Sequence, residues 1–316
     1  MEKVVLAQKT NEAVTQYLKQ YCEVVFCKEG DAEDLKCALR DAVAVLLGTW
    51  VKFSKDMIDA APKLKVISRT GAGVDNVDID YASQKGILVL STPYENRVSV
   101  AEHAVAMICA LSKQLVFLDG KTRGGDFGAR RLNLPVDMDK KTLGLIGCGG
   151  IAREVAKKCS LAFNMDVIGY DPYLSVSPEG IVLCPDIEDV FRRADYISLH
   201  IPYTQGTKNL VDARLLGFMK PTAFLINTAR GGIVNEIALY ESLSNKRIAG
   251  AALDVFETEP LAAGSALAEL ENILLTPHTA ALTKECSRRV ALCAVRGIVD
   301  YLQGKEPAYI YNKTKV

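Results

Sequence analysis

Short runs of apolar residues alternate with amphipathic, helix-like segments from one end of the chain to the other. In the first hundred residues, apolar runs predict five strands, at 3–8, 22–27, 42–48, 64–70 and 86–92. Helical patterns occupy the stretches between the first four strands, at 11–20, 31–42 and 54–64. Strands that alternate with helices in this way pair in parallel, and the helices cover both faces of the sheet.

A second strand and helix series follows a long helical pattern at 99–120 and a loop rich in Gly and Arg at 122–135. Six further apolar runs predict strands, at 142–147, 165–171, 196–202, 223–229, 249–255 and 272–277. A last helix, at 283–304, is expected to return to the first series. The pattern predicts an α/β protein of two doubly wound parallel-sheet domains, the second inserted into the first. We expect residues 1–98 with 283–316 to form one domain and residues 99–282 the other.

Composition narrows the class of protein. A chain of 316 residues is long for one core and suggests two domains. Lys plus Arg equals Asp plus Glu at 38 each, which disfavours nucleic-acid and membrane-surface roles. No apolar stretch is long enough to span a bilayer, and the start lacks the layout of a signal peptide. The nine cysteines form no C-x-x-C pair, so we expect core thiols in a reducing cytoplasm and no metal site.

A cofactor motif directly follows the strand predicted at 142–147. Gly147 permits a tight turn, Gly149 lets a pyrophosphate approach the backbone, and Ala152 lets the next helix pack closely. Asp171 ends the next strand, about 20 residues further on, where a carboxylate would bind the ribose hydroxyls and repel a 2′-phosphate. The motif therefore indicates NAD in preference to NADP. The alternative is that Asp171 merely begins a turn.

Charged residues that follow strands in the second series provide candidate chemistry. Arg230 offers a guanidinium fork for a carboxylate, and His278 follows the apolar run that ends in Thr-Pro. Alone, His278 is better explained as a capping or partly buried imidazole at a strand end than as a catalytic group. The intervening "ALDVFETEP" holds three acids, Asp254, Glu257 and Glu259, and spacing does not say which of the two glutamates would stabilise an imidazolium. A cation, a proton carrier and a nicotinamide together are what hydride transfer to a carbonyl requires.

Six ordered motifs carry a resemblance to a known family. "SRTGAGVDNVDI", "VAEHAVAMICAL", "GCGGIA", "NTARGGIVNE", "GAALDVFETEP" and "LTPHTA" resemble the D-isomer-specific 2-hydroxyacid dehydrogenases, in their phosphoglycerate dehydrogenase-like branch. The resemblance implies a flavodoxin-like substrate domain and an inserted Rossmann NAD-binding domain. It also implies an NAD-dependent oxidoreductase that acts on the CH–OH group of a D-2-hydroxy acid.

The same resemblance assigns roles to individual residues. Arg230 would bind and polarise the 2-oxo acid, and His278 would be the general acid/base with Glu259 as its partner, which leaves Glu257 in a loop. Asp254 would hold the nicotinamide carboxamide. The substrate set is Arg69, Ala72, Gly73, Arg230 and His278. The cofactor set is Ala72, Gly147, Gly149, Gly150, Ile151, Asp171, Ile201, Thr228, Ala229, Arg230, Asp254, His278 and Ala281.

Two positions depart from the family pattern. Gly150 stands where a charged or bulky residue is common, and Ala280 stands where Gly is common. Either difference would alter how tightly NAD is held. His103 is expected to be a packing or interface residue, and His200 to orient structure rather than carry protons. The resemblance also implies a homodimer formed through the helix at about 99–118. After the returning helix, we expect no room for the C-terminal regulatory domain that some phosphoglycerate dehydrogenases carry.

The substrate is less well defined than the reaction. "LLGTWVKF" places Thr49 and Trp50 where related enzymes often carry a phosphate-binding Arg, which favours a small unphosphorylated acid of the hydroxypyruvate or glyoxylate kind. Against this, Arg130 and Arg131 would restore positive charge from a dimer partner and admit 3-phosphohydroxypyruvate. The alternative function is an NAD-responsive, corepressor-like binding protein on the same fold. A formate dehydrogenase-like activity is disfavoured because that reaction needs no proton donor.

Overall fold

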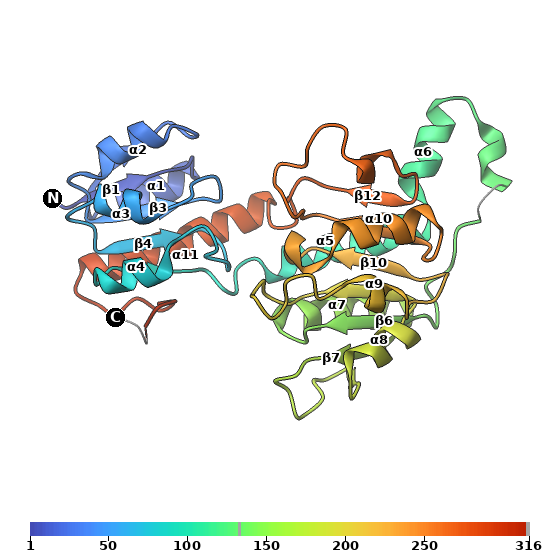
Figure 1. Ribbon diagram of the computed structural model, residues 1–316. Coiled ribbons are helices and arrows are strands. Elements are labelled where there is room, and N and C mark those ends of the chain that lie inside the picture. Colours follow the sequence, from blue (N-terminus) through green and yellow to red (C-terminus); the bar gives the residue numbers. More distant parts are fainter. Residues whose placement is uncertain (132–133, 314–316) are drawn as a thin grey trace. The chain divides into compact units, whose positions relative to one another are not determined.

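The computed structural model describes residues 1–131 and 134–313, and the predicted α/β architecture is confirmed (Figure 1). The chain divides into a first domain, Met1–Asn96 with Ala281–Val316, and a second domain, Arg97–Ala280. Each predicted boundary lies within two residues of this division. Residues 132–133 of the predicted loop and 314–316 of the predicted first domain lie outside the described residues.

The first domain contains a five-stranded sheet with the flavodoxin-like order β2-β1-β3-β4-β5, and its strands pair in parallel. Each strand lies inside one of the predicted apolar runs: β1 Lys3–Leu6, β2 Glu23–Phe26, β3 Ala44–Leu47, β4 Val66–Arg69 and β5 Leu88–Leu90. The helices are α1 Glu12–Leu18, α2 Ala32–Leu39, α3 Lys55–Asp59, α4 Ile79–Gln84 and α11 Lys284–Leu302. The short helix α4 was not predicted.

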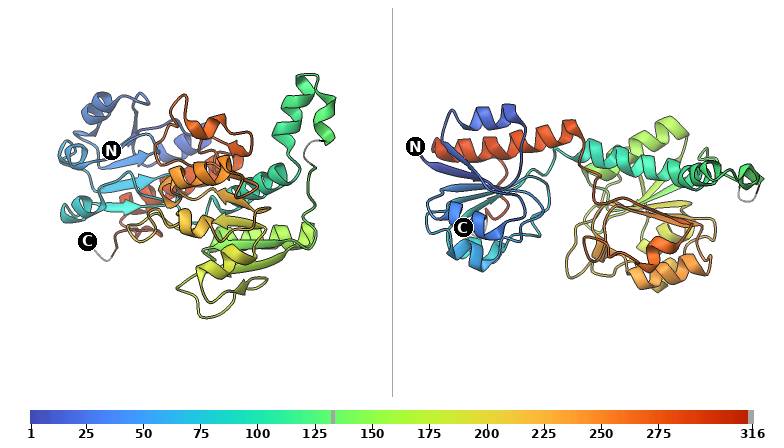
Figure 2. Two further views of the ribbon diagram at one scale, coloured as in Figure 1. Left: turned by 45° about the vertical axis from the view of Figure 1, so that its right-hand side comes forward. Right: turned by 90° about the horizontal axis from the view of Figure 1, so that it is seen from above.

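Alternate residues of these strands build two cores on opposite faces of the sheet. Val5, Val45 and Ile67 point into the core under α2, α3 and α4. Val4 and Leu46 point into the core under α1 and α11. Figure 2 shows α11, in red, running along one face of the sheet beside α1. The last helix therefore completes the first domain, which explains why the chain returns to it.

The second domain contains a seven-stranded parallel sheet in the order β12-β11-β10-β9-β6-β7-β8. Its strands are β6 Thr142–Ile146, β7 Asp166–Tyr170, β8 Val182–Leu183, β9 Tyr196–Leu199, β10 Phe224–Asn227, β11 Gly250–Leu253 and β12 Ile273–Leu275. Only the two-residue strand β8 was not predicted. The order reverses between β6 and β9, and ligands of open α/β sheets bind at such a switch point, outside the carboxyl ends of the strands.

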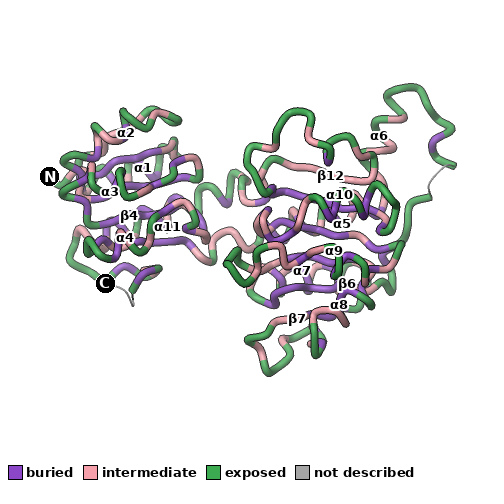
Figure 3. The backbone as a smooth tube through the Cα atoms, viewed as in Figure 1, coloured by how far each residue is buried: buried purple, intermediate pink, exposed green. Residues whose placement is uncertain are grey.

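Helices cover this sheet on both faces, and the strands are its most buried part (Figure 3). The helices are α5 Arg97–Ser112, α6 Leu115–Arg123, α7 Gly150–Phe163, α8 Ile187–Arg193, α9 Ala213–Leu216 and α10 Glu236–Ser244. Three 3-10 turns complete the elements: η1 Phe127–Arg131, η2 Gly231–Ile233 and η3 Ala266–Glu269. α5 and α7 pack together over β6, β10 and β11.

The prediction of one continuous helix at 99–120 was wrong. Gln114 takes a left-handed conformation with φ 50°, and α5 and α6 meet at an angle of 57°. The bend lets α5 stay in the core while α6 leaves it, and α6 has no buried residue. No single helix of the described chain is long and apolar enough to span a membrane, although α5 and α6 taken together pass on length and composition.

Candidate functional site

The glycine-rich turn after β6 has the shape that a dinucleotide needs. Gly147 has φ +85°, and a Cβ on it would lie 2.6 Å from the His200 carbonyl oxygen, so only glycine fits. A Cβ on Gly149 would meet no atom within 4 Å, which leaves open space above the turn. α7 begins at Gly150 without a side-chain cap, so first-turn N–H groups are available to an anion. Ala152 is fully buried in the core shared by α7 and β6.

Asp171, which directly follows β7, faces this turn. Its Oδ2 accepts a hydrogen bond from the Cys148 N–H at 3.0 Å, and its Oδ1 accepts one from the Tyr173 N–H at 3.0 Å. Both bonds fix the carboxylate beside the glycine turn. The structure thus brings together the two parts of the predicted cofactor motif.

The residues that follow β9 and β10 supply further groups at the same edge of the sheet. Ile201 follows β9 and lies against Gly147, whose hypothetical Cβ would be 2.7 Å from its Cγ2. Thr228, next after β10, is buried, and its hydroxyl finds no hydrogen-bond partner among the described residues. A buried polar atom without a partner is costly, so this hydroxyl suits a bound polar ligand. The open turn and the unpartnered hydroxyl together fit a dinucleotide.

Arg230 lies in a tight loop that leaves no space for a side chain at the next residue, Gly231. Its Nη1 donates to the Ala229 carbonyl at 2.7 Å, and its own carbonyl accepts from Asn227 Nδ2 at 2.9 Å. The following Gly231 lies so close to Phe256 that a Cβ would be 1.9 Å from the Phe256 carbonyl oxygen. The half-buried guanidinium is therefore fixed to the loop that follows β10.

Asp254, at the end of β11, organises the loop that carries His278. The carboxylate is fully buried and accepts from the Thr276 hydroxyl at 2.6 Å, the Thr279 N–H at 2.8 Å and the Ala280 N–H at 2.9 Å. Its carbonyl accepts from the His278 N–H at 2.7 Å. This anchoring of the histidine loop was not visible in the sequence, since the partners lie more than twenty residues apart. The carboxamide contact implied for Asp254 stays a prediction.

The structure separates the two glutamates that spacing left open. Glu259 Oε2 lies 2.7 Å from His278 Nδ1, and Glu259 Oε1 accepts from the Phe256 N–H at 3.1 Å. Glu257 instead accepts from the Glu236 N–H at 2.9 Å, and Glu236 accepts from the Glu257 N–H at 2.6 Å. Glu259 is thus the partner of the imidazole, and Glu257 fixes a loop.

The other two histidines differ in their surroundings. His103, on α5, lies with its Nε2 at 3.1 Å from the Thr276 hydroxyl and 3.6 Å from Asp254 Oδ1, so it adds a polar contact to the histidine loop. Its expected packing or interface role stays a prediction. His200 contacts the Ser198 hydroxyl at 2.9 Å, and burial lowers its pKa to about 4. A histidine that stays neutral at physiological pH is unsuited to carry a proton there.

The predicted substrate residues of the first domain cluster in the turn after β4. The Arg69 side chain folds back over Gly71, donates to the Thr70 carbonyl and is buried. It therefore supports the turn that contains Ala72 and Gly73. Trp50 packs against the core under α2, and its indole N–H donates to the Ala7 carbonyl at 2.7 Å. Ala281, assigned to the cofactor set, is the first residue of the returning segment of this domain.

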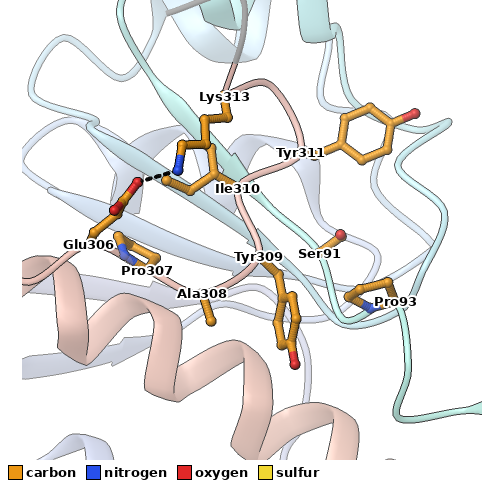
Figure 4. Close-up of a pocket in the computed structure, with 9 residues that line it drawn as sticks. All are labelled: Ser91, Pro93, Glu306, Pro307, Ala308, Tyr309, Ile310, Tyr311 and Lys313. Carbon is orange, nitrogen blue, oxygen red and sulfur yellow. Dashed lines mark ion pairs between the residues drawn. The ribbon is translucent and has the colours of Figure 1, made fainter.

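A pocket in the first domain is lined by none of these predicted residues and lies along the segment from Glu306 to Lys313 (Figure 4). That segment pairs with the edge strand β5 through Leu90 and Ile310, and an ion pair of 2.7 Å joins Glu306 to Lys313. The side chains drawn around it form no acid and base pair with a histidine. Within the described ranges, no cluster of His, Cys, Asp and Glu has the arrangement of a metal site.

Comparisons with known proteins agree with this geometry. Residues 105–280 match the family model described as D-isomer specific 2-hydroxyacid dehydrogenase, NAD binding domain. The chain is 36% identical to the glyoxylate reductase of Thermofilum pendens, over 98% of this chain and 94% of that protein. The TT0316 protein of Thermus thermophilus has a similar structure, with a TM-score of 0.91, 31% identity, and coverage of 98% and 99% of the two chains.

The D-3-phosphoglycerate dehydrogenase of Methanocaldococcus jannaschii is 34% identical over the whole of this chain, which spans 60% of the length of that relative. The matched domain model indicates a nicotinamide cofactor, in agreement with the glycine turn and Asp171. Family model, relatives and structure all lead to one assignment: the chain belongs to the D-isomer-specific 2-hydroxyacid dehydrogenase family.

Proposed function

We propose that the protein is an NAD-dependent D-2-hydroxyacid dehydrogenase that interconverts a small 2-oxo acid and the corresponding D-2-hydroxy acid. The observation that carries the proposal is the 2.7 Å contact between Glu259 and His278, at the edge of the sheet that also presents the glycine turn and Arg230. A proton carrier beside a fixed cation is what reduction of a 2-oxo acid requires. A nicotinamide cofactor, when bound, supplies the hydride.

The residues of the chain would divide the remaining work. Glu259 holds Nδ1 of His278, so Nε2 is the ring atom that would deliver a proton to the carbonyl oxygen during reduction and remove it during oxidation. The negative charge of Glu259 stabilises the imidazolium before the proton is given up. Arg230 would bind the carboxylate and polarise the carbonyl group through charge-assisted hydrogen bonds. The Ala72 and Gly73 turn of the first domain would receive the substrate carboxylate.

The preference for NAD over NADP rests on Asp171. Its carboxylate is fixed beside Cys148 by a 3.0 Å hydrogen bond, where it would accept bonds from ribose hydroxyls and repel a 2′-phosphate. We expect catalytic efficiency with NADH to exceed that with NADPH by tenfold or more. Equal efficiency with the two cofactors would count against this role for Asp171.

The proposed substrate is a small unphosphorylated 2-oxo acid of the hydroxypyruvate or glyoxylate kind. Trp50 supports this choice, since it stands where related enzymes often carry a phosphate-binding Arg, and its only N–H donor in the side chain is already bonded to the Ala7 carbonyl. Arg130 and Arg131 are exposed on η1 and keep 3-phosphohydroxypyruvate as the competing substrate. The deciding quantity is kcat/KM for hydroxypyruvate against 3-phosphohydroxypyruvate. A tenfold advantage for the phosphorylated compound would overturn the argument from Trp50.

The functional test is NADH oxidation with a panel of hydroxypyruvate, glyoxylate, pyruvate, branched 2-oxo acids and 3-phosphohydroxypyruvate. We expect turnover with at least one of them, and a fall in kcat of about 10²–10⁴-fold in His278→Ala with NADH binding kept. His103→Ala is the comparison, because His103 contacts the Thr276 hydroxyl and not the Glu259 carboxylate. NADH binding without turnover of any acid would favour the corepressor-like alternative.

We further propose a homodimer built on α5 and the arm that follows it, which consists of α6 and η1. The arm exposes large apolar side chains, including Leu115 at 55%, Val116 at 61% and Phe127 at 69% exposure, which a free surface seldom carries so close together. Light scattering at micromolar concentration should give twice the chain mass. Phe127→Glu should lower it towards the mass of one chain, and a wild-type monomer would contradict the proposal.

A cytoplasmic location is proposed from the cysteines. All nine are free thiols, and five of them are buried. Burial raises the pKa of Cys159 to about 12, so this thiol stays protonated and inert. Such a set is typical of a reducing compartment. Fractionation of the source cells, with the protein followed by antibody, tests the location, and recovery in an oxidising compartment would refute it.

A further inference from the structure

Arg97, the first residue of α5, lies across the start of α7 in the second domain. A Cβ built on Gly150 would stand 2.5 Å from Arg97 Cδ, 2.9 Å from Nη1 and 3.0 Å from Nε. The aliphatic stem and the guanidinium therefore pass directly over the first helical residue of the cofactor motif. A side chain at position 150 would displace the Arg97 side chain from this place.

Arg97 adds positive charge to a place that already attracts anions. The N-terminus of a helix carries partial positive charge, and the Arg97 side chain lies beside the first residue of α7. Arg97 also lies close enough to α7 to affect Glu154, one turn further along. The pKa of Glu154 is lowered, mainly by its hydrogen bond and charge interaction with Lys158, with Arg97 among the lesser contributions. The helix terminus and the Arg97 side chain together would attract a negatively charged group of a ligand.

Open space is available for that anion. No atom lies within 4 Å of a Cβ built on Gly149, the residue before the helix, and α7 has no side-chain cap. Arg153 donates from Nε to the Cys148 carbonyl at 3.1 Å, which holds the turn in this open form. An anion above Gly149 would meet the backbone N–H groups of α7 on one side and the Arg97 side chain on another.

We propose that Arg97 binds the pyrophosphate of the nicotinamide cofactor, in the role that a side chain at position 150 would otherwise fill. The inference rests on the proposed function only in that the second domain binds a dinucleotide. Its chemistry is a charge-assisted hydrogen bond between a guanidinium and phosphate oxygens, so removal of the side chain should weaken binding by about 10–100-fold. The nicotinamide and ribose ends of the cofactor would not depend on it.

The test compares three variants in titrations with NADH and with ADP-ribose, which keeps the pyrophosphate but lacks nicotinamide. Arg97→Ala should bind both ligands about 10–100-fold more weakly, and Arg97→Lys should recover part of the loss, since Lys supplies a point charge without the planar fork. The double variant Arg97→Ala with Gly150→Arg should recover affinity as well, because a guanidinium is returned to the same place from the other helix. Lys157→Ala is the matched control, as it removes one positive charge from an exposed position on α7.

The outcomes separate the two proposals. If wild-type protein binds neither NADH nor ADP-ribose, the proposed function fails. If it binds both and Arg97→Ala binds them equally well, or if Lys157→Ala loses as much affinity as Arg97→Ala, the role of Arg97 is refuted. Thermal unfolding of each variant checks the fold. If Arg97→Ala does not fold, Arg97→Lys and the double variant decide the question. The proposal is then refuted if neither variant binds ADP-ribose with an affinity close to that of wild type.

Discussion

Replacement of Asp254 by Asn tests whether this carboxylate holds the histidine loop in place. The side chain is fully buried, and its two oxygens accept hydrogen bonds from the Thr276 hydroxyl and from the N–H groups of Thr279 and Ala280, at 2.6, 2.8 and 2.9 Å. An amide has almost the same volume but only one oxygen. Its NH₂ group would face either one or the other of two backbone N–H groups, donor against donor.

The size of the effect follows from these contacts. Loss of one hydrogen bond to a charged acceptor removes about 1.5–3 kcal/mol, and the buried N–H left without an acceptor adds about 1–3 kcal/mol. We therefore expect Asp254→Asn to lower the free energy of unfolding of the second domain by about 3–5 kcal/mol. For a domain of this size each kcal/mol lowers Tm by roughly 2–4 °C, which gives a fall of roughly 10 °C.

Thermal unfolding followed by circular dichroism measures the change. Asp166→Asn is the control, because Asp166 is exposed at the start of β7 and its replacement should change stability by less than about 0.5 kcal/mol. Below the unfolding temperature, Asp254→Asn should also lower kcat, since the His278 N–H is bonded to the carbonyl of the same residue at 2.7 Å. A Tm within 1 °C of wild type would show that the loop does not depend on this carboxylate.

Four further predictions follow from single contacts. Glu259→Gln removes the carboxylate that holds His278 Nδ1 at 2.7 Å, so kcat should fall by tenfold or more with NADH binding kept, and an unchanged kcat would exclude Glu259 as the partner. Asp171→Ser should raise kcat/KM with NADPH by tenfold or more relative to NADH, whereas an unchanged ratio would assign cofactor choice elsewhere. Burial lowers the pKa of His200 to about 4 from about 6.5 in the unfolded chain, so below pH 6.5 the unfolded chain takes up a proton that the folded protein does not. The free energy of unfolding should therefore fall by about 3 kcal/mol on this account as pH drops from 6.5 towards 4. Urea unfolding at several pH values should show that this free energy falls less steeply with acid in His200→Asn than in wild type, and equal slopes would refute the prediction. Asn312 is buried and makes three hydrogen bonds at the β5 edge, so Asn312→Ala should cost about 1–3 kcal/mol of stability in a urea titration, and a change below 0.5 kcal/mol would contradict it.

Strands and the glycine turn were predictable because their signals are local. Parallel strands buried on both faces read as continuous apolar runs, and each of the five strands of the first domain lies inside one such run. Gly147 and Asp171 stand at the ends of consecutive strands, β6 and β7, and adjacent pairing brings them together. A two-residue strand such as β8 gives too short a pattern to be recognised. The break between α5 and α6 was missed because Gln114 is not a residue that marks a helix end, although here it takes a left-handed conformation.

Side-chain partners across the chain were not predictable in the same way. Spacing could not choose between Glu257 and Glu259, since both follow β11 by a few residues and the choice depends on how the loop turns. In the structure, the Glu257 and Glu236 backbones exchange hydrogen bonds with each other's side chains, at 2.9 and 2.6 Å. That exchange directs Glu257 away from the imidazole. The resemblance to a family identified Glu259 correctly as the neighbour of His278, but for a reason that the residues alone do not contain.

The two halves of the Glu259–His278 pair are fixed by separate backbone anchors. Glu259 uses its second oxygen to accept from the Phe256 N–H at 3.1 Å, so its carboxylate is oriented by the loop after β11. His278 takes φ +54°, a left-handed conformation that is unfavourable for most side chains and is kept here because Asp254 binds the residues on either side. Each group therefore reaches its partner without relying on the contact between them. In its proposed role as a proton carrier, a pair built this way would keep its geometry when the charge on the imidazole changes, which a pair held together only by its own ion pair would not do.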